Sequence, residues 1–262
     1  MIELPPHRLP AAPGWFTAGA PGPASLHEHV TATGVGAWWG DHALRPRAVA
    51  VSCAGRVLLS GDPGSVTPAF LAPFAHSHVE APVRFLPVLG AAFDRVIPVE
   101  RMVYVHRESV APPRLPRGVT VRRLEPDDAP ALAALSPDGA WIHASWGGPA
   151  GLAASGHAWG AVDRGGRLAA VACGYFVGTA YEDIAVLTLP ERRREHLASA
   201  CVTSLCADIT ARGRTASWSC GRDNRPSRLL AWNAGFRLHR EYVRHATGNA
   251  AARPQRASRV VV

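Results

Sequence analysis

Three arginines directly before an amphipathic helix form the part of the sequence best suited to bind a charged ligand. Arg192, Arg193 and Arg194 follow an apolar run, and a helix is predicted to begin near Leu197. The first turn of a helix has backbone N–H groups without intrahelical partners and a partial positive charge, so it attracts phosphate. The arginines add full charges beside it. The sequence therefore predicts a phosphate-binding turn at residues 192–198.

This turn lacks the glycine that such loops usually contain. Glycine lets the backbone approach a phosphate without a Cβ in the way, but His196 stands at the expected position. The substitution implies either an altered turn or a looser fit to phosphate. The His196 side chain either points outward into solvent or points inward, where a phosphate would favour its protonated form. Both orientations leave the arginines and the helix N-terminus in place, so we expect the turn to bind phosphate.

The helix after this turn is predicted from one apolar stripe at helical period. Gly213 ends it as a C′ glycine would. The stripe consists of Leu197, Ala198, Cys201, Val202, Leu205, Cys206 and Ile209.

The elements around this helix are predicted from alternation and turn residues. The runs HAWGAVD, RLAAVACGYFVG and YEDIAVLTL indicate three antiparallel strands before it. TASWSCG indicates a strand after it, NRPSRLLAWNAG a short helix and FRLHREYVRHAT a closing strand. With a strand at VTVRRL and two helical regions after it, the order from residue 119 is β-α-α-β-β-β-α-β-α-β. This order predicts an α/β (α+β) fold.

A proline-rich stretch, APPRLPRG, divides the sequence because its prolines continue neither a helix nor a strand. Before it we expect a smaller α/β lobe, residues 1–111, with strands at RAVAVSCAG, RVLLSGD and RVIPVERMVYVH and helices at SVTPAFLAPFA and PVRFLPVLGAAF. Residues 112–118 are then a hinge, 119–248 the main domain and 249–262 a flexible tail.

Composition restricts the class of protein. The chain is 47% hydrophobic and 18% charged, as expected for a globular protein with a substantial core. No apolar run has the length of a membrane span, and no signal peptide is recognised, so we expect a cytoplasmic protein without membrane association. The five cysteines form no CxxC pair and are expected to be free thiols. His76 and His78 could be half of a metal site, but no partner lies at ligand spacing, so no metal is expected.

The net charge of the chain is +8, carried almost wholly by arginine. Such a charge favours anionic partners, namely nucleotide cofactors, nucleic acid or acidic carriers. An arginine-rich composition is explained equally well by GC-rich coding. Charge alone does not decide the function.

The order of elements and three of the quoted segments resemble the GNAT superfamily of N-acyltransferases over roughly Val119 to Thr247. VLTLPERRREHLASACV is similar to the cofactor signature of the family, a strand, then Arg/Gln-x-x-Gly-x-Gly/Ala, then a helix. NRPSRLLAWNAGF is similar to its Asn-x-x-Ser/Ala…Gly-Phe segment, and GVTVRRLEPDDAPAL to its usual entry. With its extra N-terminal lobe, the chain resembles a two-lobed subgroup of GNAT acetyltransferases. The signature positions are Arg193, His196, Ala198, Asn224, Ser227, Gly235 and Phe236.

This resemblance implies a mixed, mostly antiparallel sheet flanked by helices, with acetyl-CoA as co-substrate. Its pyrophosphate is expected against Arg193, Arg194, His196, Leu197 and Ala198. Asn224 and Ser227 are expected near its pantetheine or adenine. Strands that diverge between YEDIAVLTL and TASWSCG would pair with the amide-rich pantetheine arm at Leu187, Thr188 and Leu189. Trp141 and Trp146 lie where this fold often forms its acceptor pocket.

The expected general acid of the family is missing. Many members have a tyrosine seven residues after the asparagine, and Ala231 occupies that position here. A carboxylate on the central strand, Glu182 or Asp183, could act as the general base for the amine. Because neighbouring residues of a strand face opposite ways, only one of them can face the cleft. Other candidates for proton transfer are Tyr181, Cys220 and Tyr242, although a buried structural thiol is favoured for Cys220.

The sequence thus predicts an N-acyltransferase that moves an acyl group, most simply acetyl, from acyl-CoA to an amine of a small molecule or peptide by direct attack. One alternative keeps the fold but uses an aminoacyl-tRNA or a carrier-protein thioester as donor, because the loop has changed and the chain is basic. Another is a non-catalytic GNAT module that only binds. A homodimer is a further expectation.

Overall fold

The computed structural model describes residues 1–5 and 14–251. The predicted flexible tail lies mostly outside these residues. Its first part, residues 249–251, is described and is attached to the N-terminal lobe, where the Asp94 N–H donates to the Asn249 carbonyl at 3.0 Å. No helix in the described ranges combines the length and apolarity that a membrane crossing requires.

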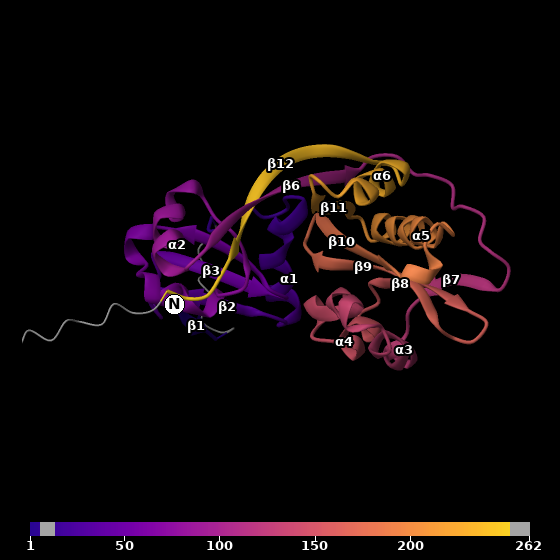
Figure 1. Cartoon of the computed structure of the whole chain (residues 1–262), viewed down its shortest axis with the longest axis horizontal. Helices are drawn as coiled ribbons and strands as arrows, with labels where there is room; N and C mark the ends of the chain where they lie inside the picture. The colour runs from indigo at the N-terminus through magenta and orange to yellow at the C-terminus, as the bar shows by residue number, and fades with distance from the viewer. Residues whose placement is uncertain (6–13, 252–262) are drawn as a thin grey trace, which may run out of the picture.

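Within the described residues, twelve strands form one continuous sheet in the order β1-β2-β3-β4-β5-β12-β6-β11-β10-β9-β8-β7. The neighbouring pairs β4–β5 and β10–β11 are parallel, and the others are antiparallel. Helices flank the sheet in both lobes (Figure 1). This architecture confirms the predicted α/β class with a mixed, mostly antiparallel sheet.

The C-terminal half contains the predicted elements in the predicted order. Its strands are β7 (Val119–Arg123), β8 (Ala158–Asp163), β9 (Leu168–Val177), β10 (Tyr181–Thr188), β11 (Thr215–Gly221) and β12 (Phe236–Thr247). Its helices are α3 (Ala129–Ala133), α4 (Pro149–Ala154), α5 (Leu197–Ala211) and α6 (Arg225–Asn233), with a long 3-10 segment at Pro137–Trp146. The predicted meander of β8, β9 and β10 is antiparallel.

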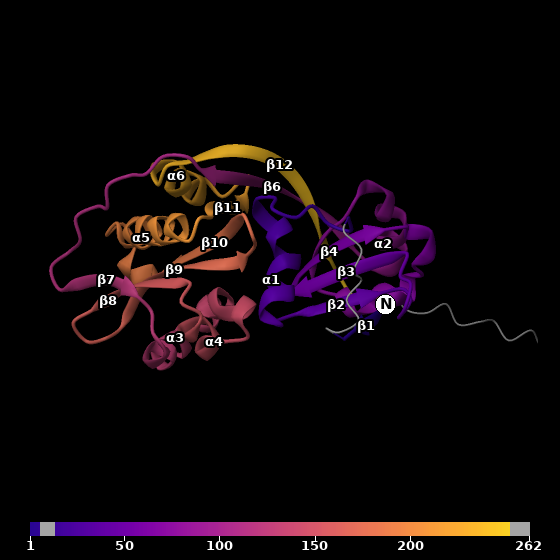
Figure 2. The same ribbon diagram turned by 180° about the vertical axis from the view of Figure 1, so that it is seen from behind.

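The N-terminal lobe is only partly as predicted. It contains β1 (Ile2–Leu4), α1 (Ser25–Thr33), β2 (Ala37–Gly40), β3 (Ala48–Cys53), β4 (Arg56–Gly61), β5 (His78–Glu80) and α2 (Leu86–Ala92). The helix predicted at SVTPAFLAPFA is a 3-10 segment, Pro68–Phe74, because Pro73 inside it cannot donate a helical hydrogen bond. Helix α1 has no counterpart in the sequence analysis. It lies between the lobes (Figure 2).

Strand β6 (Val96–His106) connects the two lobes through backbone pairing. It precedes the proline-rich stretch but pairs with β11, from Ser217↔Val105 to Gly221↔Arg101, and along its whole length with β12. Together β6 and β12 arch from one lobe to the other (Figure 1). Residues 107–118 contain no helix or strand. The domain limits predicted at residues 111–119 stay a prediction, and the sheet itself crosses them.

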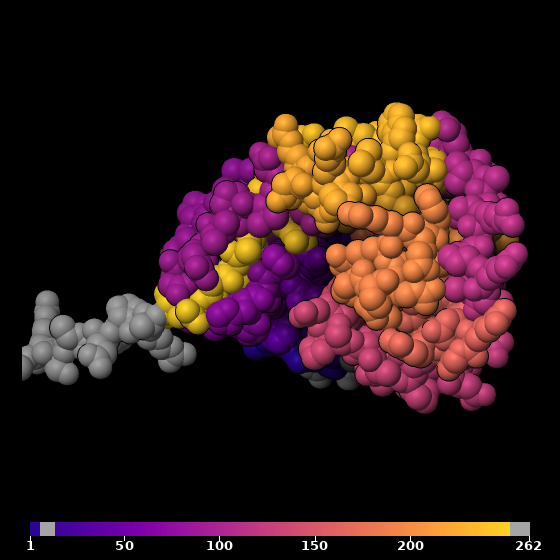
Figure 3. Space-filling view, turned by 45° about the vertical axis from the view of Figure 1, so that its right-hand side comes forward, coloured from indigo at the N-terminus to yellow at the C-terminus, as the bar shows by residue number. Residues whose placement is uncertain are grey.

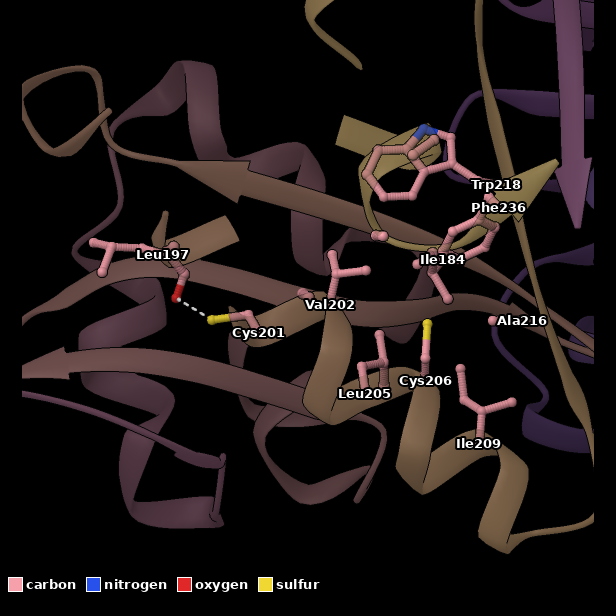
Figure 4. Close-up of a cluster of buried hydrophobic side chains, with 14 of the residues drawn as sticks. Ile184, Leu197, Cys201, Val202, Leu205, Cys206, Ile209, Ala216, Trp218 and Phe236 are labelled. Carbon is pink, nitrogen blue, oxygen red and sulfur yellow. Dashed lines mark hydrogen bonds between the residues drawn. The ribbon is translucent and has the colours of Figure 1, made fainter. Parts of the chain in front are cut away.

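Helix α5 packs its apolar stripe onto one face of β8–β11. Leu197, Cys201 and Leu205 are buried against strand residues that include Ile184 and Trp218 (Figure 4). The helix ends at Ala211, and Gly213 follows with a left-handed φ of +73°. Its apolar stripe holds the helix, and the turn before it, against the central strands.

We expect Gly235→Ala to destabilise the protein more than Gly213→Ala. Both glycines have left-handed backbone, at φ +85° and +73°, which costs a residue with a Cβ about 1–2 kcal/mol. At Gly235 the new Cβ would also clash with the carbonyl oxygen of Glu108, two residues after the end of β6, whereas Gly213 has open space. Urea unfolding should show Gly235→Ala to be about 1–3 kcal/mol less stable than Gly213→Ala. Equal stability of the two variants would contradict the close approach of this segment to β6.

Candidate active site

The central parallel strands separate halfway along their length. β10 and β11 pair only from Tyr181↔Thr215 to Ile184↔Trp218. Beyond Ile184, β10 continues to Thr188 and pairs only with β9. The backbone groups of β10 that face β11 in this stretch therefore have no partner in that strand, as the predicted divergence requires. A bulge in the β9–β10 pairing at Asp183/Ile184 lies at the same place.

A pocket of about 230 Å³ opens beside this divergence. Both lobes contribute: Arg56 and His78 come from β4 and β5, and Asp183 and Ser219 come from β10 and β11. Figure 3 shows the surface hollowed where the C-terminal segments face the N-terminal lobe. The volume is below the range of about 300–1,000 Å³ of drug-sized sites. The pocket therefore suits a small molecule.

Asp183 is the carboxylate that faces the pocket. It is buried, and its Oδ1 accepts hydrogen bonds from the Ser217 and Ser219 hydroxyls at 3.0 and 3.1 Å. Burial raises the pKa of Asp183 to about 6, against the lowering effect of these hydrogen bonds and of Arg101 and Arg56. At neutral pH the carboxylate is mostly ionised and can accept a proton.

Glu182 lies on the opposite face of β10, away from the pocket. Its side chain is fully buried and accepts from Arg212 at 3.1 and 3.0 Å, from Arg214 at 3.2 Å and from His157 at 3.2 Å. Burial alone would raise the pKa of Glu182, but the hydrogen bonds and charges of His157 and Arg212 lower it to about 2. A carboxylate held in this way ties the C-terminal end of α5 to the sheet and is unsuited to proton transfer. Of the two predicted bases, only Asp183 is suitably placed.

The basic turn keeps the backbone shape that a glycine would give. Arg194 and His196 have left-handed φ values of +67° and +60°. Histidine tolerates this region better than most residues. The His196 side chain is exposed, which matches the outward orientation. His196 therefore adopts a backbone conformation that glycine reaches readily.

The turn combines exposed charges with backbone N–H groups that have no partner within the described residues. Arg192 is engaged with Glu195, at 2.8 Å, whereas Arg193 and Arg194 are exposed and form no ion pair within the described part of the chain. The backbone N–H groups of residues 197–199 have no acceptor among the described residues. Leu197 is buried, so it offers only its N–H. Exposed positive charge beside free N–H groups at a helix N-terminus is the combination that favours an anion.

The other residues predicted to bind the co-substrate lie on two sides of the divergence. Leu187, Thr188 and Leu189 lie beyond the last β10–β11 pair, and none of them lines the pocket. Asn224 and Ser227 do line it. Asn224 caps α6 by accepting the Ser227 N–H at 3.1 Å, and the Ser227 hydroxyl accepts from the Trp218 indole at 3.0 Å.

The two predicted acceptor tryptophans differ in their surroundings. Trp141 lines the pocket, is 45% exposed and lies 6.0 Å from the Tyr175 ring, centroid to centroid. Trp146 does not line the pocket. Its indole donates to the Gly174 carbonyl at 2.8 Å, and its ring stacks on His157. Trp146 therefore packs against His157 and β9, outside the pocket. Trp141 is the better candidate for contact with an acceptor.

The structure also decides between the remaining proton-transfer candidates. Ala231 is fully buried and has no group that can transfer a proton. Cys220 reaches the pocket, but burial raises its pKa, which keeps it a neutral thiol. Tyr242 also lines the pocket, and burial raises its pKa to about 12. Asp183 therefore has the pKa closest to neutrality among these groups.

Several pocket residues were not found from the sequence. Arg56, Arg101, Arg244 and Glu80 line the pocket with Asp183. They come from four strands that are distant in sequence, and the arginines look like others scattered over both lobes. The strand alternation of RMVYVH and EYVRHAT could have placed Arg101 and Arg244 on one face. It could not have shown that β6 and β12 are neighbours.

Comparisons with known proteins agree with this geometry. The family model described as GNAT acetyltransferase matches residues 98–244. A Streptomyces virginiae protein described as an uncharacterized N-acetyltransferase in the mutA 5′ region is 80% identical over 212 residues, which are 81% of this chain and 90% of that protein.

Two solved structures are similar to both lobes together. A GCN5-related N-acetyltransferase-like protein from Streptococcus suis matches with a TM-score of 0.62 at 17% identity, covering 81% of this chain and 88% of that one. A tandem GNAT protein from the clavulanic acid biosynthesis pathway matches with a TM-score of 0.56 at 15% identity, covering 88% and 89%. At these identities the similarity shows the fold alone.

Glu182→Gln should destabilise the protein by about 3 kcal/mol at neutral pH, because it leaves the charges of Arg212 and Arg214 without their buried partner. Glu191→Gln removes only an exposed pair with Arg167, 3.7 Å apart, and should change stability by less than about 0.5 kcal/mol. Urea unfolding measures both.

The stability difference between wild type and Glu182→Gln should also depend on pH. Because the folded pKa of Glu182 is lowered to about 2 from its ordinary value of 4.5, its stabilisation is complete above pH 4.5 and is lost as the pH falls toward 2. The difference between wild type and Glu182→Gln should therefore shrink on acidification through this window. A difference that is absent at pH 7, or unchanged by acid, would contradict the role given to the cluster.

Proposed function

Because this chain belongs to the GNAT acetyltransferase family, we propose that it transfers an acetyl group from acetyl-CoA to the amine of a small molecule held in the pocket between its two lobes. The chain is a GNAT-type N-acyltransferase; the donor, the acceptor and the residue roles are the proposal. This proposal rests on one observation, namely that the diverging strands and the pocket form a single site. The diverging ends of β10 and β11 open into the pocket that holds Asp183.

The choice of donor is supported by two separate features. The turn at Arg193, Arg194 and His196 offers two exposed charges and the free N–H groups of a helix start, which suit a pyrophosphate. The unpaired edge of β10 beyond Ile184 suits an extended, amide-rich arm that pairs as an added strand would. Residues 187–189 would supply this edge. An aminoacyl-tRNA or carrier-protein donor remains an outcome of the test below.

Acetyl-CoA supplies an acyl carbon activated as a thioester, to which the amine nitrogen bonds as the carbon–sulfur bond breaks. The protein contributes orientation, a free amine and backbone N–H groups directed at the carbonyl oxygen. The Asp183 carboxylate accepts the proton that the ammonium must lose, directly or through water, and coenzyme A leaves as a thiolate that takes up a proton. Ser217 and Ser219 fix the orientation of its carboxylate.

The pocket favours a small-molecule acceptor over a peptide. Its volume of about 230 Å³ is small, and α1 and Trp141 restrict it from two sides. The N-terminal lobe forms one wall through β4 and β5 and so takes part in acceptor binding. A homodimer and a cytoplasmic location are further parts of the proposal.

Ala198→Glu should abolish the thermal stabilisation of the protein by coenzyme A, because it places a carboxylate beside the phosphate-binding N–H groups. Ala207→Glu makes the same change on an exposed position of the same helix and should keep the stabilisation. Melting temperatures with and without coenzyme A measure the effect. An unchanged shift in Ala198→Glu would refute the site. Salt-sensitive binding of aminoacyl-tRNA by a wild type that ignores coenzyme A would replace the donor.

Asp183→Asn should lower kcat/KM by about 100-fold or more at pH 7, because an amide cannot accept the proton. The pKa of Asp183 is raised to about 6, so the wild-type profile should lose activity below pH 6, and the variant should lack this limb. The variant should regain activity at high pH, where the amine is free without help. Asp127→Asn removes an exposed carboxylate remote from the pocket and should leave the profile unchanged. An Asp183→Asn profile identical to wild type would exclude the base.

A further inference from the structure

Three arginines line the pocket from β4, β12 and β6, and β5 lies between β4 and β12 in the sheet. Arg56 begins β4, directly after a tight turn in which Ala54 and Gly55 have left-handed φ values of 49° and 70°. Arg101 lies in β6, and Arg244 lies in β12. All three reach the pocket that also contains Asp183.

These arginines have buried nitrogen atoms without partners. Within the described residues, no hydrogen bond is found for Arg56 Nη1, Arg101 Nε or Arg244 Nε, all of which are shielded from solvent. The neighbouring His78 Nδ1 is in the same condition. A buried donor without an acceptor costs about 1–3 kcal/mol, and more when the group is charged. Three such donors around one cavity, with a histidine nitrogen beside them, indicate a ligand with acceptor oxygens.

The two carboxylates of the pocket, Asp183 and Glu80, only partly offset these three charges. Asp183 is bonded to two serine hydroxyls, and Glu80 lies 3.7 Å from Arg240. Neither forms an ion pair with Arg56, Arg101 or Arg244 within the described residues. Burial lowers the pKa of Arg56, and the adjacent charge of Arg101 lowers it further. The pocket therefore holds an excess of positive charge close to the proposed base.

We propose that these arginines bind a carboxylate carried by the amine acceptor, so that the substrate is a small amino acid-like compound with its amine toward Asp183. The inference rests on the proposed function and adds the class of acceptor. A guanidinium can hold a carboxylate through two parallel N–H bonds, and three guanidinium groups line this one pocket. The cavity of about 230 Å³ limits the acceptor to a compact molecule.

The phosphates of the donor are a poor match for these arginines. They are assigned to the turn before α5, and none of residues 193–198 lines this pocket. Arg56 comes from the N-terminal lobe and lies on the side of the pocket formed by β4 and β5. The three arginines and the basic turn are therefore two separate anion sites, and coenzyme A binding tests their independence.

The first experiment measures binding without catalysis. Glutarate serves as the carboxylate probe. It replaces chloride stepwise at constant ionic strength, and the melting temperature of the protein is measured at each concentration. Wild type should be stabilised, whereas Arg56→Gln and Arg244→Gln should respond less or not at all. Arg45→Gln removes an exposed arginine of the same lobe and should behave as wild type. An equal response of wild type and both pocket variants would overturn the carboxylate site.

The second experiment measures acceptor preference with isosteric pairs. 4-Aminobutyrate is compared with 4-aminobutanamide, 6-aminohexanoate with 6-aminohexanamide, and L-phenylalanine with L-phenylalaninamide, at equal concentrations of free amine and with acetyl-CoA as donor. In at least one pair wild type should acetylate the acid roughly 10- to 100-fold more efficiently, the range expected for a charge-assisted hydrogen bond. Arg56→Gln should lose most of this preference through KM, while its stabilisation by coenzyme A stays as in wild type.

The outcomes separate this inference from the proposed function. Neutral amines that react as well as acids in every pair, or no acid acetylated by a protein that binds coenzyme A, would overturn the acceptor class. Loss of coenzyme A stabilisation in Arg56→Gln would assign the arginine to the donor instead and would equally overturn it. A wild type that coenzyme A does not stabilise contradicts the proposed donor, and the glutarate titration still decides the carboxylate site.

Discussion

The pairing of β6 with both β11 and β12 is the interaction on which the site depends. A strand that leaves the N-terminal lobe is inserted into the sheet of the other lobe, and β12 returns along it to reach β5. Because buried backbone groups must be paired, this ladder fixes the lobes relative to one another. It brings Arg56 and His78 of one lobe to the same pocket as Asp183 of the other. Without it, the diverging strands would open onto solvent instead of a shaped cavity.

Local patterns were sufficient to predict the C-terminal half of the fold. The apolar period of α5, the C′ glycine at Gly213 and the short turns between β8, β9 and β10 depend on residues close in sequence, and all three are observed. The position of β6 between β11 and β12 depends on pairing between distant segments, which leaves no periodic trace in either one. The same reason explains why α1 and the arginines of the pocket were missed.

The type of site could be predicted from the sequence, but the orientation of its side chains could not. Alternation along β10 required that only one of Glu182 and Asp183 face the cleft, but it could not say which one. The decision comes from Arg212, Arg214 and His157, which reach Glu182 from other elements and hold it on the far face. The sequence also could not predict whether the His196 side chain points outward or inward. Its left-handed backbone, at φ +60°, costs only modest strain, and the sequence does not reveal this conformation either.

The late position of β12 in the sequence has a consequence for how the protein is made. Strand β6 is synthesised early, but its full-length partner, Phe236–Thr247, lies far downstream. During synthesis the N-terminal lobe must therefore wait, with the edges of β5 and β6 unpaired, until almost the whole main domain has left the ribosome. Contacts of such long sequence separation slow folding, and open strand edges invite association with other chains. The arch that builds the site thus also makes the nascent chain dependent on protection during synthesis.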